Sequence, residues 1–481
     1  MSAQTRGVET TVVKVGDIHA TIFKMLDHPP APVIVIAHGF SGSQQLMAPM
    51  ATTLAQNGYV AVTFDFSGHG RNPAPMTGGV RDLQQSTAVL LSDIEKVVAF
   101  ARRLPGVDGR VAVAGHSMAT DLIVRQARRD PSIAAVVAFS FFAQDVTPDS
   151  PRNLLIVDGA WESRRLIDVG LHVVSETAKA PAQPGVTYGD IAAGKGRRLA
   201  LARGVEHIGV LYSEDALSET VAWLNDVFGR NEEGFVDRRG KWLALAFAGL
   251  IALARPLAGL LPVVSPAPLG ASLPWRRLAP LALAPAVLTP LLLWKIPTDV
   301  MPILLGDYLA LHLGLYGLLT ASGLRLMGKQ AELPSAPFAP LVIASLAVGA
   351  YYTLVFGVPL DAYVVSFFPT AQRALLIPPI FVGCALYFLA DEWMTRGACV
   401  APGGYAFSKF CFIASLGIAV ALNPRRLFFL VIIAIVVIIL LTVYGLVGRW
   451  VYARTRDPRP GALGAAFGLA WAIAVCFPIV G

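Results

Sequence analysis

Cysteine is scarce in this chain, which has four cysteines among 481 residues. None of them forms a Cys-x-x-Cys pair, so neither a disulfide scaffold nor a redox pair is indicated. A secretory signal is also missing, because residues 1–16 are polar and lead directly into a strand-like segment. We therefore expect the soluble part of the chain to stay in the cytoplasm. The cysteines are Cys384, Cys399, Cys411 and Cys476.

Charged residues are also few, at 15% of the chain, while hydrophobic residues make up 55%. The composition changes near residue 240, where a charged, glycine-containing linker at 231–241 precedes an almost entirely apolar remainder. This pattern predicts a soluble domain at 1–230 and a polytopic membrane domain at 242–481. We interpret the net charge of +7 as basic residues that face anionic membrane lipids, and nothing points to nucleic acid.

The apolar remainder contains stretches long enough to cross a bilayer as helices. The first stretch is interrupted by Arg255 and Pro256, so we expect it to stay on one face, which leaves seven crossings. The alternative is eight crossings. The stretches are residues 242–264, 278–294, 303–324, 341–358, 374–390, 405–422, 427–447 and 461–480.

The basic residues between these stretches favour seven crossings. With seven, nine of them lie on the side of the soluble domain and four on the other side, which follows the positive-inside rule. With eight, the two groups change sides. We therefore expect a bacterial-type inner-membrane protein with a cytoplasmic soluble domain. The nine are Arg276, Arg277, Arg325, Lys329, Arg396, Arg449, Arg454, Arg456 and Arg459, and the four are Lys295, Arg373, Arg425 and Arg426.

The most informative motif is Gly-His-Ser-Met-Ala at residues 115–119. It follows an apolar run and precedes a helix-like stretch at 119–129, so it predicts a strand, a sharp turn and a helix. Such a turn lifts the hydroxyl of Ser117 clear of a sheet, and the small residues on either side permit the strained backbone of a nucleophile elbow. Ser117 is therefore the candidate nucleophile.

Other segments of the soluble part support this interpretation. Apolar runs at 32–37 and 60–64 alternate with helical stretches, which predicts a parallel sheet. The first run ends in His-Gly-Phe at 38–40, where a backbone N–H can face a developing oxyanion. We predict that the backbone N–H groups of Phe40 and Met118 form the oxyanion hole.

Residues 10–230 resemble the α/β-hydrolase superfamily of serine hydrolases. The resemblance is carried by His-Gly at 38–39, Gly-His-Gly at 68–70, the elbow, and His207 in Gly-Val-Glu-His-Ile-Gly. It implies an α/β-hydrolase fold in which His207 is the general base of Ser117. Ala119 stands where the family usually has a second glycine. Only residues 141–152 are available for a cap, so we expect no substantial cap before the all-α transmembrane bundle begins.

The acid that orients His207 has two candidates. Family members commonly carry an aspartate three residues after the glycine that ends the preceding strand, and Glu162 holds that place after Gly159. Glutamate is a known alternative acid in this fold. We predict Glu162 as the acid, with Asp158 as the alternative.

The apolar half contains a candidate polar site at Asp307, Tyr308, His312 and Tyr316. Polar residues within membrane spans are costly, and the last three share one helical face. They indicate either a substrate path or an interhelical hydrogen-bond seam. A zinc centre is not favoured, because His312 is the single histidine after the linker.

These features predict an integral-membrane serine hydrolase that cleaves an acyl ester or thioester without a cofactor or metal. The apolar bundle makes lipids and other amphiphiles plausible substrates, and we expect residues 242–268 to cover the uncapped active site. The alternative is a transporter or receptor whose hydrolase domain is regulatory or inert. A fold by itself names no substrate.

Overall fold

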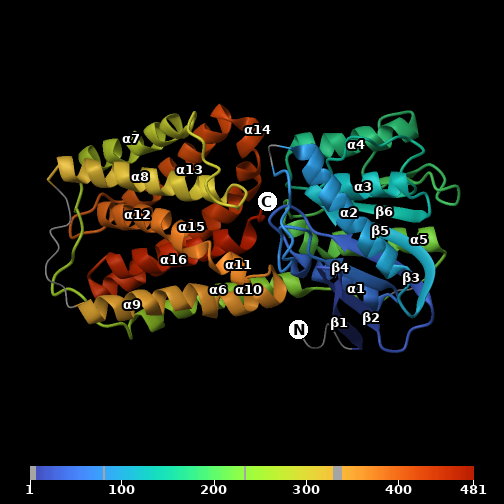
Figure 1. The fold of residues 1–481 in the computed structure, drawn as a ribbon, viewed down its shortest axis with the longest axis horizontal. Helices are drawn as coiled ribbons and strands as arrows, with labels where there is room; N and C mark the ends of the chain where they lie inside the picture. Colours follow the sequence, from blue (N-terminus) through green and yellow to red (C-terminus); the bar gives the residue numbers. More distant parts are fainter. Residues whose placement is uncertain (1–6, 80–81, 232–233, 329–337) are drawn as a thin grey trace. The chain divides into compact units, whose positions relative to one another are not determined.

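The structure, a computed structural model, describes residues 7–79, 82–231, 234–328 and 338–481. The chain divides into two compact units, whose ribbon is drawn in Figure 1. Unit 1 consists of Met1–Leu245, Leu360–Ser366 and Pro478–Gly481, and unit 2 of Ala246–Pro359 and Phe367–Phe477. Two short segments from the apolar half of the sequence are therefore part of unit 1, which the composition did not indicate.

Unit 1 is built on a nine-stranded sheet with the order β1-β2-β4-β3-β5-β6-β7-β9-β8. The strands from β4 to β9 in this order are parallel, and antiparallel strands lie at both edges. All seven residues of β3 are buried, as expected for a strand covered on both faces. The bounds are β1 Val8–Val15, β2 Ile18–Met25, β3 Ala31–Ala37, β4 Val60–Phe64, β5 Val107–His116, β6 Ile133–Phe139, β7 Leu154–Gly159, β8 Thr187–Tyr188 and β9 Arg197–Ala202.

Helices alternate with these strands, which confirms the predicted α/β fold. Because the inner strands are parallel, their carboxyl ends meet at one edge of the sheet, where the loops of a site gather. Between β6 and β7 the described residues contain turns and bends but no helix, so this connection forms no cap. The helices are α1 Ala48–Gln56, α2 Leu83–Ala101, α3 Met118–Arg129, α4 Arg164–Ala178 and α5 Glu214–Phe228, with 3-10 turns η1 Gln44–Met47 and η2 Gly209–Tyr212.

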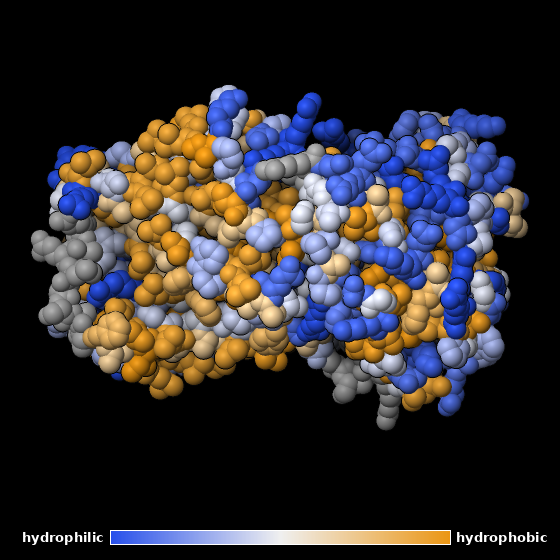
Figure 2. All heavy atoms as spheres, viewed as in Figure 1, coloured by the Kyte–Doolittle hydropathy of each residue, from blue (hydrophilic) through white to orange (hydrophobic). Residues whose placement is uncertain are grey.

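The described residues of the second half are helical. Eight of their helices, some formed by adjoining elements, are long and apolar enough to span a membrane, which indicates a membrane protein. Figure 2 shows apolar residues over most of the visible surface of the helical part, whereas hydrophilic residues prevail on the α/β part. The helices are α6 Arg239–Ala258, α7 Trp275–Leu293, α8 Gly306–Leu326, α9 Phe338–Ala350, η3 Tyr351–Val355, α10 Gly357–Tyr363, α11 Ala371–Ala374, α12 Ile377–Thr395, α13 Gly404–Leu422, α14 Pro424–Leu427, α15 Phe429–Thr455 and α16 Arg459–Cys476.

Two features of these helices follow from single residues. The first candidate span, α6, continues through Pro256 as one helix of 20 residues. The helices α8 and α12 approach closely at Gly383, which has no Cβ. A Cβ there would lie 2.1 Å from the carbonyl oxygen of Ala310. Small residues at such contacts let membrane helices pack backbone against backbone.

Candidate active site

Ser117 lies in a strained turn between β5 and α3. Its φ of +52° belongs to the left-handed region that residues other than glycine rarely adopt. The turn is held by a 2.9 Å hydrogen bond from the Ser117 N–H to the Phe139 carbonyl. A Cβ at Gly115 would lie 3.1 Å from the Cβ of Ala119, so glycine lets α3 pack close to β5. This is the predicted strand, turn and helix, with the hydroxyl presented at the strand end.

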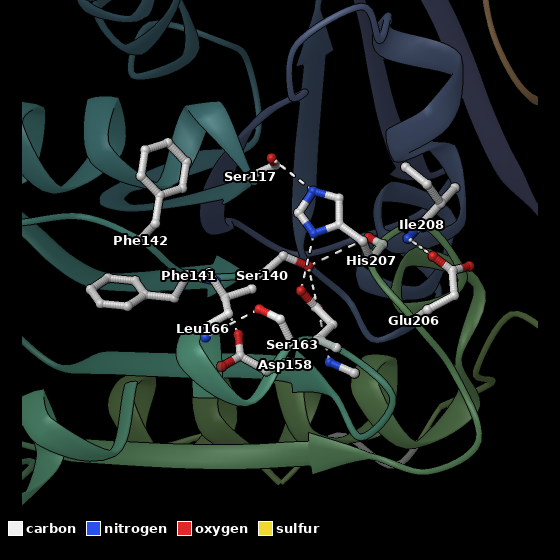
Figure 3. A network of polar contacts seen from close by, with 12 residues as sticks. Ser117, Ser140, Phe141, Phe142, Asp158, Ser163, Leu166, Glu206, His207 and Ile208 are labelled. Atoms are coloured by element: carbon white, nitrogen blue, oxygen red, sulfur yellow. Dashed lines mark hydrogen bonds and ion pairs between the residues drawn. The ribbon is translucent and has the colours of Figure 1, made fainter. Parts of the chain in front are cut away.

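Three side chains from separate loops form a relay (Figure 3). The Ser117 Oγ lies 2.9 Å from His207 Nε2, and His207 Nδ1 lies 3.0 Å from Glu162 Oε2. The Glu162 side chain is only 2% exposed, whereas that of His207 is 24% exposed. A nucleophile, a base and a buried acid in this order are the arrangement that activates a serine hydroxyl.

Glu162 is fixed by two further donors. Its Oε1 accepts a 2.7 Å hydrogen bond from the Ser140 hydroxyl and a 3.0 Å hydrogen bond from the Gly159 N–H. These donors hold the carboxylate with its other oxygen toward His207. Ser140 was not predicted from the sequence, because a serine after an apolar run belongs to no motif.

Asp158, the alternative acid, faces away from His207 in Figure 3. It is fully buried, and its Oδ1 accepts a hydrogen bond of 3.0 Å from the Phe141 N–H. Burial, with a smaller contribution from the charge of Glu162, raises the pKa of Asp158 to about 8 against the lowering effect of the Phe141 N–H. Asp158 is therefore protonated at neutral pH and carries no charge to stabilise an imidazolium. The structure brings Glu162, the predicted acid, to the histidine.

Two buried histidines support the loops around the relay. His116 Nε2 lies 2.8 Å from the His207 carbonyl oxygen, so this nitrogen carries the proton and donates it. Burial lowers the pKa of His116 to about 3, which keeps the ring neutral. His38 donates from Nδ1 to the Gly39 carbonyl and accepts at Nε2 from the Phe66 N–H.

The loop after β3 lies directly against the elbow. A Cβ at Gly39 would lie 3.0 Å from the His116 ring and 3.1 Å from the Ser117 Cβ, so glycine allows this close approach. Phe40 follows at once, and Met118 is the first residue of α3, where a backbone N–H has no partner within the helix. The structure thus places both predicted oxyanion segments next to Ser117, and the role of the two amides stays a prediction.

Asp65, at the end of β4, ties this loop to the next one. Its carboxylate accepts hydrogen bonds from the Gln44 N–H at 2.8 Å and from the Arg71 N–H at 2.9 Å. Gly70 has a φ of +53°, and a Cβ there would lie 2.4 Å from the carboxyl carbon of Asp65. Gly70 of the Gly-His-Gly motif is therefore required, because the backbone passes so close to the Asp65 carboxyl group.

Residues 28–161 match the family model described as "Serine aminopeptidase, S33". The N-terminal part of this chain has an α/β-hydrolase-like fold. A protein of Mycobacterium phage D29, provisionally named a non-heme haloperoxidase, is 30% identical over 105 residues. That match covers 22% of this chain and 34% of the phage protein, so the chain spans about a third of the relative's length.

Solved structures of hydrolases align with a little under half of the chain. A predicted CIB-like hydrolase from Thermoplasma acidophilum is 16% identical, with a TM-score of 0.34, and covers 46% of this chain and 97% of its own. A provisionally named dienelactone hydrolase from Klebsiella pneumoniae subsp. pneumoniae MGH 78578 is 15% identical, with a TM-score of 0.34, and covers 47% of this chain and 99% of its own.

The candidate polar site of the helical part is only partly connected. The Tyr308 hydroxyl lies 3.3 Å from His312 Nδ1, and His312 Nε2 lies 3.0 Å from the Ser415 hydroxyl on α13. Tyr316 donates to the carbonyl of Ala282 on α7, and Asp307 accepts from its neighbour's N–H and from the N–H of Val300 in the preceding loop. These bonds join α7, α8 and α13, as an interhelical seam would.

A second buried polar cluster in the helical part was missed by the sequence analysis. Lys409 on α13 forms an ion pair with Asp391 on α12, and its Nζ lies 3.4 Å from the Tyr387 hydroxyl. One turn further on, Arg396 pairs with Glu392 at 2.8 Å. In the part of the chain that the structure describes, no group of three or more His, Cys, Asp and Glu side chains is arranged to hold a metal ion.

Proposed function

We propose that this protein is a membrane serine hydrolase that cleaves acyl esters or thioesters with Ser117 as nucleophile. The observation that carries the proposal is the relay from Ser117 through His207 to Glu162, at 2.9 and 3.0 Å, on an elbow with positive φ. The α/β-hydrolase fold agrees with this reaction but does not specify it.

The geometry supports an acyl transfer in two stages. His207 Nε2 takes the Ser117 proton as Oγ forms a bond to the substrate carbonyl carbon, and Glu162 stabilises the resulting imidazolium. The N–H groups of Phe40 and Met118 stabilise the oxyanion. His207 then protonates the departing alkoxide or thiolate. In the second stage it removes a proton from water, which attacks the acyl-enzyme and releases the acid.

Labelling of the full-length protein tests this function. A fluorophosphonate probe should label the wild type and leave Ser117→Ala unlabelled, because the probe reacts with the activated hydroxyl. Ser175→Ala is a matched control, since Ser175 Oγ donates to a carbonyl within α4. Labelling of Ser117→Ala at the wild-type rate would end the proposal. A panel of esters and thioesters of graded chain length then tests our expectation that the substrates are lipids or other amphiphiles.

We also propose that all eight apolar helices cross the membrane. Unit 1 contains residues before 246, residues 360–366 and residues 478–481, and four of the eight helices lie between each successive pair of these segments. A chain that leaves one side of a membrane and returns to it crosses an even number of times. Four crossings before residues 360–366 and four after them satisfy this condition. The expectation of seven crossings leaves three crossings before residues 360–366, which is an odd number.

We place the hydrolase in the cytoplasm at a bacterial-type inner membrane. With eight crossings the nine basic loop residues lie opposite the hydrolase, but Arg238, Arg239 and Lys241 stand immediately before the first span. With these three, seven basic residues lie on the hydrolase side and nine on the opposite side, which is a small difference. The first helix usually dominates orientation, and its basic flank is on the hydrolase side.

Cys399 provides a native reporter for both statements. It is exposed between α12 and α13, so eight crossings place it opposite the hydrolase and seven place it on the hydrolase side. In right-side-out vesicles, an impermeant thiol reagent should label Cys399 from outside, with Cys399→Ser as control, while the linker resists external protease. A protected Cys399 with a protected linker would contradict eight crossings, and linker cleavage would contradict the cytoplasmic hydrolase.

Transport is a second candidate function, because the Lys409–Asp391 pair is buried within two apolar helices. Ionisable residues inside membrane spans commonly line ion or substrate paths. Vesicles that contain Ser117→Ala should then take up a proton or solute, and Lys409→Met should abolish that uptake. Uptake unaffected by Lys409→Met would remove the support that this pair gives.

A further inference from the structure

Residues 360–366, here named the return segment, bind the loop that carries Phe40. The Ser366 N–H donates a 2.9 Å hydrogen bond to Ser43 Oγ, and the Ser366 hydroxyl donates a 3.0 Å hydrogen bond to Gln45 Oε1. Ser43 also donates to Gln45 Oε1 at 2.7 Å. Ser43 and Ser366 are buried and Gln45 is half-buried, so these three bonds form a closed, partly buried triangle.

The triangle lies next to the predicted oxyanion turn. The Gly42 N–H donates to the Gly39 carbonyl at 3.1 Å, which closes a turn that contains Phe40 and ends one residue before Ser43. At the other end of the turn, Gly39 packs against the Ser117 Cβ. A displacement of Ser43 therefore shifts the Phe40 amide relative to Ser117.

A second contact of the return segment reaches the same loops by another route. Asp361 binds the Arg71 guanidinium through both carboxylate oxygens, at 2.7 and 2.9 Å. The Arg71 N–H donates to Asp65, which also accepts from the Gln44 N–H in the loop after β3. The return segment thus contacts both loops that Asp65 joins.

Residues 478–481 hold the second loop from another side. The Ile479 N–H donates to the Gly68 carbonyl at 2.8 Å, and the Ile479 carbonyl accepts from the Met76 N–H at 2.9 Å. Ile479 is almost fully buried. The loop from residue 68 to residue 76 is consequently paired at both ends with a segment that follows α16.

We propose that Ser366 and Asp361 are positioning residues that complete the oxyanion hole of the hydrolase. This inference rests on the proposed function. Each bound segment is continuous in sequence with a candidate membrane span. The return segment begins within the last residues of the span 338–363, and residues 478–481 follow α16. Both segments belong to unit 1, together with the loops that they bind. The inference does not involve residues 242–268, which the sequence suggested as a cover.

The expected signature is a loss of kcat with little change in KM. Oxyanion donors act on charge that develops in the transition state, so a displaced donor lowers kcat while substrate binding is retained. Ser43→Ala and Asp361→Asn should each lower kcat by about tenfold or more, since a shift of about 1 Å can cost about a hundredfold. Ser366→Ala keeps the backbone bond to Ser43 and should lose less kcat. Ser366→Thr keeps the hydroxyl as well and should retain a kcat close to that of the wild type.

The experiment uses the full chain in detergent with a short soluble ester, and thermal unfolding is recorded for every variant. Asp130→Asn is the matched control, because Arg102 and Asp130 form a 2.7 Å pair of similar exposure at the end of α3 remote from Ser117. Exchange of the charges in Arg71→Asp with Asp361→Arg should recover part of the kcat lost in either single variant.

An unchanged kcat in Ser43→Ala and Asp361→Asn would overturn the inference, and so would an equal loss of kcat in Asp130→Asn. It would also be overturned if the loss of kcat followed the loss of thermal stability and Ser366→Thr lost as much kcat as Ser366→Ala. A wild type without Ser117-dependent turnover would instead refute the proposed hydrolase function. The two failures are therefore distinguishable.

Discussion

Buried acids are treated differently in the two units of the molecule. In the hydrolase, Glu162 is satisfied by neutral donors, the Ser140 hydroxyl and the Gly159 N–H, and shares its second oxygen with a partly exposed histidine. In the helical part, Asp391 is paired directly with the full charge of Lys409. Glu162 therefore keeps one oxygen for the histidine, whereas the acid in the helical part faces an opposite charge directly.

The surroundings explain this difference. The loops at the edge of the sheet supply backbone N–H groups to a carboxylate, but the backbone groups inside a membrane helix are already used by the helix itself. A buried charge there needs an opposite charge from a side chain, because its removal from water costs several kcal/mol. Glu392 on α12 and Arg396, the residue that follows α12, pair at 2.8 Å and obey the same rule.

The largest effect should come from breaking the hydrolase relay. Glu162→Gln keeps the shape of the side chain but removes its charge, so we expect kcat to fall by about a thousandfold to ten-thousandfold. Asp158→Asn should leave kcat nearly unchanged, because the Asp158 carboxyl is already neutral. Steady-state kinetics on a soluble ester decide between them. Collapse in Asp158→Asn with tolerance of Glu162→Gln would reverse the assignment.

A smaller effect should come from breaking the membrane pair. Lys409→Met leaves Asp391 buried without its cation and should destabilise the protein by about 3–5 kcal/mol. Thermal unfolding in detergent measures the change. Arg426→Met is the control, since Arg426 and Asp299 form a more exposed pair, for which about 1 kcal/mol or less is expected. The double variant Lys409→Met with Asp391→Leu should recover most of the loss, and no recovery would argue against the pair as the cause.

The third effect concerns Asp158 and is spread over several pH units, so it is small at each step of pH. Its folded pKa of about 8 lies above its ordinary value of 3.8, so the folded state holds a proton that the unfolded state releases between these values. The free energy of unfolding should therefore fall as the pH rises from about 4 to about 8, by up to about 1.4 kcal/mol for each pH unit.

Asp158→Asn removes this titration and keeps an oxygen that can accept from Phe141. The stability of the variant relative to the wild type should increase across that pH range and level off above pH 8. Denaturant unfolding at pH 5, 7 and 9 measures it, and a constant difference would mean that Asp158 is not protonated in the folded state.

The parts of this molecule that the sequence predicted are those with local signals. The elbow at Ser117 is encoded by neighbouring residues, and the place of Glu162 is set by its distance from Gly159. These segments could be located before any contact was known, and the α/β fold followed from alternating apolar runs.

The parts that could not be predicted depend on contacts between distant residues. Lys409 and Asp391 meet only because α12 and α13 pack in one particular register, and Ser140 gains its role only when Glu162 folds over it. The return segment reads as an ordinary helix end. Its bonds to Ser43 and Gln45 join residues more than three hundred positions apart, and no periodic pattern signals such a contact.

The pairing of Ile479 with Gly68 and Met76 also sets an order of events during synthesis. The loop after β4 is made early, but its partner Ile479 emerges only after roughly 400 further residues, at about 5–20 residues per second. For a period on the order of twenty seconds or longer, the ribosome carries a sheet whose second site loop lacks its bonds to Ile479. This loop is therefore completed only after the apolar helices have been made.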